Sequence, residues 1–123
     1  MSIDKNIVID LAYLKEVSSD NNEFIIEMID IFQAQTPGYV DQLEAALKIE
    51  DWIRVSEMAH KIKPTLTFMG VESARVVMAS IESRARDGVD FESIKADFAD
   101  MKEVFQIIYL KLEDKKKELQ ANG

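Results

Sequence analysis

The stretch DWIRVSEMAHKIKPTLTFM, residues 51–69, decides the fold because its apolar residues recur every three or four positions. A spacing of three and four residues places side chains on one face of an α-helix, so we predict a helix with one buried face. Asp51 is a favourable N-cap for this helix, and Gly70 is a favourable residue for the turn that follows it. The residues of the apolar stripe are Trp52, Val55, Ala59, Ile62, Leu66 and Met69.

Three further segments show the same periodicity and are predicted to be helices. In the first of them, Pro37 and Gly38 predict a kink or a break near Thr36, because proline removes a helical hydrogen bond. A charged tail, KLEDKKKELQANG, follows the last apolar positions and is interpreted as a solvated helix end that frays. The three segments are Asn22–Lys48, Glu72–Arg86, and Phe91 to about Leu119.

The connections between these segments are short, with Gly88 expected to end one helix and Asp90 to cap the next. Short loops make successive helices antiparallel, so we predict an all-α, up-and-down four-helix bundle. A short extra helix over about residues 10–17, with Asp10 as N-cap, precedes it. Its apolar residues, Leu11, Leu14 and Val17, are expected to cover one end of the core. We expect one domain over residues 1–123, with its core over about 22–119.

Composition excludes several classes of protein. The 123 residues include 15 basic and 23 acidic residues, and the net charge of −8 argues against nucleic acid or an anionic membrane as the partner. The absence of cysteine excludes disulfides and thiolate metal sites. The segment MSIDKNIVIDL has no basic start followed by an apolar core, and no apolar run approaches the ~20 residues of a membrane span. A cytoplasmic monomer is therefore expected.

The chain contains one histidine, His60, and helix geometry turns it away from the core. At ~100° per residue, His60 falls about 130° from the centre of the apolar stripe. Lys63 lies one turn further along, within reach of the imidazole. An exposed histidine is usually an ordinary surface residue. The ring of Pro64 clashes with the carbonyl of His60 and disturbs the helix there. A proline at this position is explained in one of two ways: an exposed face tolerates it, or it leaves room for another protein to approach His60.

Two stretches resemble the signature of histidine-containing phosphotransfer (HPt) domains. The first, AHKIKPTLTFMG, has an Ala-His pair, an apolar residue, a lysine three after the histidine and a glycine ten after it. The second, IESRARDG at residues 81–88, resembles the following family helix. The resemblance extends from Phe24 to about Leu112 and implies an antiparallel four-helix bundle. The sequence departs from the family at Pro64, where glycine is usual, which bears on the local helix geometry and on how closely a partner approaches.

The resemblance implies a carrier rather than an enzyme. Such a domain accepts a phosphoryl group from a receiver-domain aspartyl phosphate and passes it to another receiver. His60 would be the phosphoacceptor, Lys63 would neutralise phosphoryl charge, and Glu82 matches a position that hydrogen-bonds the imidazole. The expected partners are receiver domains of response regulators, of a hybrid histidine kinase, or of both. No cofactor or metal is expected on this chain, since the receiver brings Mg²⁺, and no phosphate-binding glycine loop of a kinase is present.

A partner-binding surface is expected around the histidine. Lys61, Arg75, Arg84 and Arg86 are interpreted as a basic collar that steers the acidic pocket of a receiver. Arg86 also matches a family position for a docking cation. The residues expected to contact the partner are Ile53, Ser56, Lys61, Pro64, Thr67, Phe68 and Arg86.

Three other functions are weighed against this one. Glu57-x-x-His60 has the spacing of di-iron bundles, but that design needs the motif twice and facing inward. A hydrolase would require a nucleophile and a pocket that the sequence does not show. A helical adaptor that binds a partner through Ile53, Pro64 and Phe68 without phosphorylation stays open. Covalent phosphate on His60 would distinguish the carrier from the adaptor.

Overall fold

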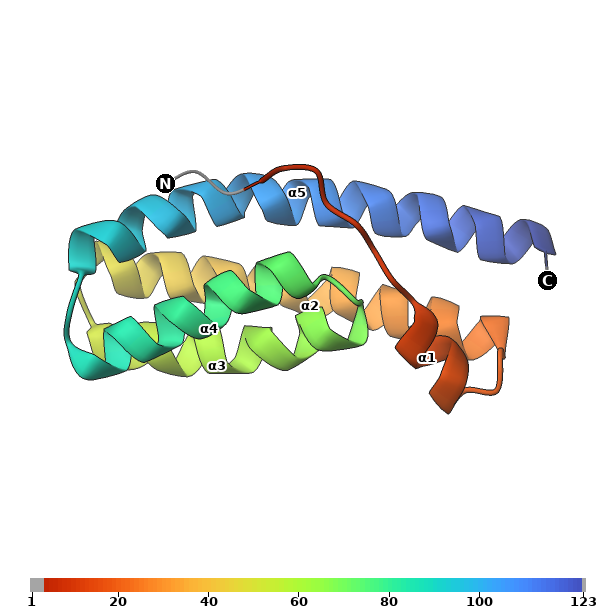
Figure 1. Cartoon of the computed structure of the whole chain (residues 1–123), viewed down its shortest axis with the longest axis horizontal. Coiled ribbons are helices and arrows are strands. Elements are labelled where there is room, and N and C mark those ends of the chain that lie inside the picture. Colours follow the sequence, from red (N-terminus) through yellow and green to blue (C-terminus); the bar gives the residue numbers. More distant parts are fainter. Residues whose placement is uncertain (1–3, 123) are drawn as a thin grey trace.

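The computed structural model describes residues 4–122, which form one helical bundle (Figure 1). The long helices α2 to α5 run antiparallel to one another in succession. Contacts of α3 with α4, of α2 with both α3 and α5, and of α4 with α5 close the bundle. The predicted all-α four-helix bundle with a short N-terminal helix is confirmed. The helices are α1 (Ala12–Val17), α2 (Asn22–Lys48), α3 (Trp52–Phe68), α4 (Glu72–Asp87) and α5 (Phe91–Asn122).

Side-chain and glycine caps fix the helix ends. The Asp51 carboxylate accepts the backbone N–H of Arg54 at 3.1 Å and starts α3. Gly88 ends α4 in the left-handed conformation, with φ of 71°, which glycine adopts without steric cost. Both predicted caps are confirmed. Asp90 precedes α5 as expected and its carbonyl accepts the N–H of Ile94, but its own φ is +57° rather than extended.

The core consists of the apolar stripes of the four long helices. The stripe of α3 is fully buried at Val55, Ala59, Ile62 and Leu66. One end of the bundle is closed by the half-buried side chain of Trp52, which stacks on Phe91 with ring centroids 4.0 Å apart and planes 6° apart. Burial of these stripes supplies the main driving force for folding and holds the four helices in a fixed register.

A kink or a break was expected near Thr36, and the break is wrong, because α2 is continuous from Asn22 to Lys48 with Pro37 inside it. The kink stays a prediction. Proline removes one helical hydrogen bond, but the buried residues on either side of it belong to the same stripe. Phe32 lies before Pro37 and Val40 after it, and both pack in the core. Tertiary packing on both sides therefore keeps the helix intact across the missing bond. The helix α3 likewise continues through Pro64.

An extended N-terminal strap, residues 5–11, runs along α5 before α1 begins (Figure 1). Its own side chains Ile7, Ile9 and Leu11 are buried, and the ammonium of Lys111 on α5 donates to the Ile7 carbonyl at 2.5 Å. The strap was not predicted from the sequence. Its apolar residues alternate with polar or exposed ones, which is the pattern of an extended segment with one buried side.

The strap ends against the turn between α3 and α4. The N–H of Asp10 donates to the carbonyl of Gly70 at 3.3 Å. Gly70 has φ of +69°, and a Cβ there would lie 1.7 Å from the Asp10 carbonyl oxygen. Only glycine therefore allows the strap to approach this turn.

The short helix α1 begins at Ala12, not at Asp10 as expected. Asp10 still accepts the N–H of Ala12 at 3.0 Å, but its backbone belongs to the strap. Leu14 is buried as expected, whereas Val17 is 54% exposed. The spacing from Leu11 to Val17 explains this difference, because two steps of three residues rotate the side chain ~120° away from the first position.

The last helix packs further along α2 than expected. α5 extends to Asn122, and the ammonium of Lys116 donates to the Asp30 carboxylate at 2.7 Å. The side-chain amide of Asn22 also donates to the Leu119 carbonyl at 3.3 Å. The interpretation of the tail as a solvated helix end that frays is wrong at Lys116 and Leu119, where these contacts join it to α2. No helix within the described residues combines the length and apolarity that a membrane crossing would need.

Candidate functional site

His60 lies in the middle of α3 and points out of the bundle, as the helix geometry predicts. Its side chain is 67% exposed, whereas the neighbouring Ala59 and Ile62 are fully buried. The buried neighbours hold the helix against the core and leave the imidazole accessible. An exposed side chain on a rigid element is the arrangement that a reaction with another macromolecule requires.

The carboxylate of Glu82 on α4 binds both His60 and Lys63. One oxygen, Oε2, lies 2.8 Å from Nδ1 of His60, and the other, Oε1, accepts from the Lys63 ammonium at 2.7 Å. An ionised carboxylate can only accept, so Nδ1 carries the hydrogen in this contact. The Nε2 nitrogen of the neutral ring then has a free lone pair. Lys63 was expected to reach the imidazole and instead reaches the carboxylate that orients it.

The environment of Glu82 favours its ionised form. Its side chain is only 12% exposed, and this burial works against the charge. Hydrogen bonds from Lys63 and His60 outweigh the burial, and together they hold the pKa of Glu82 below its usual value. A single buried carboxylate thus stays charged between a lysine and a histidine.

Packing between α3 and α4 positions this carboxylate. The hydroxyl of Ser56 donates to the backbone carbonyl of Glu82 at 3.2 Å. Val55 and Ala59 are fully buried on α3, and Met78 and Ile81 are fully buried on α4. Ser56, expected as a partner contact, thus uses its hydroxyl within the molecule.

The expected basic collar is only partly present. Arg84 is turned away, because it donates to Asp97 at 2.6 Å and to Ser93 at 2.7 Å, both on α5. Arg84 is two residues from Glu82, which places it ~200° around the helix. Including Arg84 in the collar was therefore wrong.

The other three cations of the collar lie in different surroundings. The ammonium of Lys61 lies 5.9 Å from the ring centroid of Tyr39. Arg75 forms an ion pair with Glu72 on its own helix. Arg86 is exposed and lies four residues after Glu82, on the same face of α4. Its guanidinium lies 3.7 Å from the carboxylate of the adjacent Asp87.

Apolar side chains flank His60 on the exposed face of α3. Ile53 is 76% exposed and Phe68 is 37% exposed. Pro64 and Thr67 are also exposed. Phe68 stacks on Tyr13 of α1, with ring centroids 5.8 Å apart. Sequence reasoning missed Tyr13, because no spacing rule relates α1 to α3.

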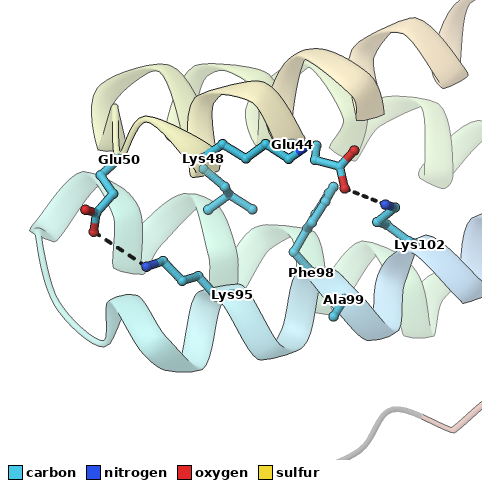
Figure 2. Close-up of a pocket in the computed structure, with 8 residues that line it drawn as sticks. Glu44, Lys48, Glu50, Lys95, Phe98, Ala99 and Lys102 are labelled. Atoms are coloured by element: carbon cyan, nitrogen blue, oxygen red, sulfur yellow. Dashed lines mark hydrogen bonds and ion pairs between the residues drawn. The ribbon is translucent and has the colours of Figure 1, made fainter.

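A separate groove of about 390 Å³ lies between α2 and α5 (Figure 2). Figure 2 shows Lys95 reaching Glu50, with 3.5 Å between the charged atoms, and Lys102 reaching Glu44. These charges are neutralised within the groove, and the groove contains no residue of α3 or α4. It is therefore distinct from the site around His60. No cluster of three or more candidate metal ligands occurs among residues 4–121.

Comparison with known families shows which family this helical bundle represents. The model of the family described as the Hpt domain matches residues 27–119. The chain belongs to the Hpt domain family. Hpt domains perform histidine phosphotransfer in phosphorelays and interact with receiver and kinase domains. The match covers most of α2 and all of α3 and α4, and leaves the strap and α1 outside. No curated protein and no solved structure matched the chain.

Proposed function

We propose that this Hpt domain carries a phosphoryl group on Nε2 of His60, taken from the aspartyl phosphate of one receiver domain and given to another. The observation that carries the proposal is the contact of Nδ1 with Glu82, which leaves Nε2 as the exposed nucleophile. The packed helix α3 supplies the rigidity that transfer between two proteins requires.

No proton needs to move during the proposed phosphoryl transfer. The Nε2 lone pair of the neutral imidazole attacks phosphorus, and the bond between phosphorus and the aspartyl oxygen breaks. The receiver regains its carboxylate, and the phosphorylated ring retains its hydrogen on Nδ1 and becomes an imidazolium. Glu82 faces that nitrogen at 2.8 Å and would stabilise the new positive charge. Transfer to a second receiver is the reverse of these steps.

Lys63 is proposed to neutralise the phosphoryl oxygens. Its ammonium is held by Glu82, the same carboxylate that orients the imidazole. A cation near the transferred group lowers the barrier, because negative charge is spread over the phosphoryl oxygens in the transition state. Glu82 is proposed as a positioning residue for both side chains.

The docking surface is proposed to comprise exposed side chains around His60, with Arg86 facing the acidic pocket of the receiver. The receiver would bring the Mg²⁺ required for its own aspartate. A chain with no cysteine and a net charge of −8 fits a cytoplasmic monomer, which is the form we propose. The exposed docking residues proposed are Ile53, Lys61, Pro64, Thr67, Phe68 and Arg86. Ser56, expected beside them, is half-buried and its hydroxyl is bound to Glu82.

The test is covalent labelling. Incubation with receiver domains from the same genome that carry labelled aspartyl phosphate should place acid-labile phosphate on this chain. His60→Gln should abolish the label and keep the helicity of the wild type, measured by circular dichroism. Equal label on the Gln variant would reject His60 as the acceptor. Binding of a receiver without any label would instead support an adaptor.

A further inference from the structure

One face of α3 contacts a single residue of α4 at three points. The hydroxyl of Ser56 donates to the backbone carbonyl of Glu82 at 3.2 Å. Nδ1 of His60 and the ammonium of Lys63 lie 2.8 Å and 2.7 Å from the two oxygens of the Glu82 carboxylate. Steps of four and three residues place Ser56, His60 and Lys63 in one row along the helix. Glu82 is therefore held both through its backbone and through its side chain.

The contact with Ser56 differs from the other two because it is made to the backbone. A carboxylate can turn about the bonds of its own side chain, whereas a backbone carbonyl moves only with its helix. A carbonyl oxygen has two lone pairs, so it can accept from Ser56 and still accept a hydrogen bond within α4. The hydroxyl of Ser56 thus joins α3 to α4 at Glu82 itself, about one helical turn before His60.

Apolar packing alone would define the separation of the two helices less closely at this point. The buried side chains between them, such as Val55 and Met78, attract one another without a preferred direction. A hydrogen bond, in contrast, has a narrow range of length and angle. Because Nδ1 of His60 lies 2.8 Å from the Glu82 carboxylate, a small displacement of α4 would stretch this contact beyond hydrogen-bond length. The Ser56 hydroxyl opposes such a displacement.

The hydrogen bonds of the other two hydroxyls of α3 lie within that helix. Thr65 donates to the Ile62 carbonyl at 2.6 Å, and Thr67 donates to the Lys63 carbonyl at 3.5 Å. Ser56 differs from both because its partner belongs to another helix. Thr65 offers a matched control, since its side chain is half-buried like that of Ser56.

Phosphoryl transfer would make the backbone contact more important. The proposed role of Lys63 turns its ammonium toward the phosphoryl oxygens, which weakens its bond to the Glu82 carboxylate. The hydroxyl of Ser56 is bound to the backbone of α4 and not to the reacting atoms, so its bond can persist during the transfer. Ser56 would then keep Glu82 in place while a side-chain contact is exchanged.

We propose that Ser56 is a positioning residue for phosphoryl transfer, which holds Glu82 so that its carboxylate stays on Nδ1 of His60. With that contact kept, Nε2 stays the nitrogen with the free lone pair. This inference rests on the proposed function, because it adds a residue to the same reaction. It gives Ser56 a role inside the domain in place of the expected contact with a partner.

The kinetic test separates positioning from docking. Ser56→Ala removes the hydroxyl and should lower the maximal rate of transfer from a phosphorylated receiver by about 3- to 10-fold, the factor for one hydrogen bond. The receiver concentration that gives half the maximal rate should stay at the wild-type value. Thr65→Val, which removes a hydroxyl bound within α3, should change neither quantity. Ser56→Thr retains a hydroxyl and should keep the wild-type rate.

A second measurement observes the imidazole without any receiver. His60 is the only histidine, so the ring-nitrogen signals in an NMR spectrum of nitrogen-labelled protein arise from one side chain. At a pH of about 8.5 an ordinary imidazole is neutral, and the two nitrogen shifts show which nitrogen carries the hydrogen. Wild type and Ser56→Thr should carry it mainly on Nδ1, and Ser56→Ala should carry a larger fraction on Nε2. Circular dichroism of every variant should match that of the wild type.

A wild-type maximal rate or wild-type nitrogen shifts in Ser56→Ala would overturn the role of Ser56. A rise in the half-maximal receiver concentration alone would mean that Ser56 is a docking residue after all. A folded Ser56→Thr variant that behaves like Ser56→Ala would show that the hydroxyl is not the group that matters. In all of these cases, label on wild-type His60 would leave the proposed function standing. Absence of label on the wild type with every receiver would overturn both.

Discussion

Substitution of Gly70 by alanine should lower the free energy of unfolding more than the same substitution at Gly88. Both glycines have left-handed backbones, with φ of +69° and +71°. Gly88 faces open space, and a Cβ there meets no atom within 4 Å. A Cβ at Gly70 would lie 1.7 Å from the Asp10 carbonyl oxygen, so the strap would have to move. The pair separates the cost of the backbone conformation from the cost of displacing the strap.

The expected difference follows from the contacts of the strap. Gly88→Ala should cost about 1 kcal/mol, which is the steric penalty of the left-handed conformation. Gly70→Ala carries the same penalty and also loses the hydrogen bond from Asp10, worth about 1 kcal/mol. Partial exposure of Ile9 and Leu11 should add roughly 1–3 kcal/mol. Gly70→Ala should thus be about 2–4 kcal/mol less stable than Gly88→Ala.

Urea unfolding followed by circular dichroism measures this difference. Thermal midpoints of the two variants should differ by roughly 10 °C for a chain of this size. The refuting result is a Gly70→Ala variant no less stable than Gly88→Ala. It would mean that the strap contributes nothing to stability at its contact with Gly70.

Two further predictions concern the site. Lys63→Ala should slow phosphoryl transfer by about 10- to 100-fold through loss of a cation near the phosphoryl group, with unchanged helicity. The control is Lys95→Ala, which removes a lysine of α5 that pairs with Glu50. An unchanged transfer rate for Lys63→Ala would exclude Lys63 from the mechanism. Hydrogen bonds from Lys63 and His60 outweigh burial and lower the pKa of Glu82 in the folded state. The charge of Glu82 therefore contributes its full stability above the unfolded pKa of about 4.3. That stability is lost as the pH falls through the lower folded pKa. Wild type should therefore exceed Glu82→Gln in urea stability at neutral pH and converge with it in acid; a difference that stays constant with pH would contradict this.

The helices were predictable from the sequence because each has a local cause. The apolar period marks α3 from Trp52 onward, and Asp51 and Gly88 are caps whose chemistry acts over three or four residues. Errors arose where a distant contact overrides a local rule. Pro37 suggested a break that packing against the core prevents, and the strap was missed because its burial depends on α5.

The exposure of His60 followed from the helix wheel, but its hydrogen-bond partners did not. Glu82 is 22 residues away, and only the packing of α3 on α4 brings its carboxylate between His60 and Lys63. The opposite error occurred with Arg84, whose charge suggested the docking face although its position on α4 turns it toward Asp97. Sequence spacing gives the direction of a side chain on its own helix, whereas the choice of partner depends on how two helices meet.

The stack of Trp52 on Phe91 provides an optical signal within the native chain. Trp52 is the only tryptophan in the sequence, so fluorescence emission excited selectively through indole arises from one defined position. That position joins the start of α3 to the start of α5. Emission changes would therefore report separation of these two helices directly, and folding kinetics can be followed without attaching a dye.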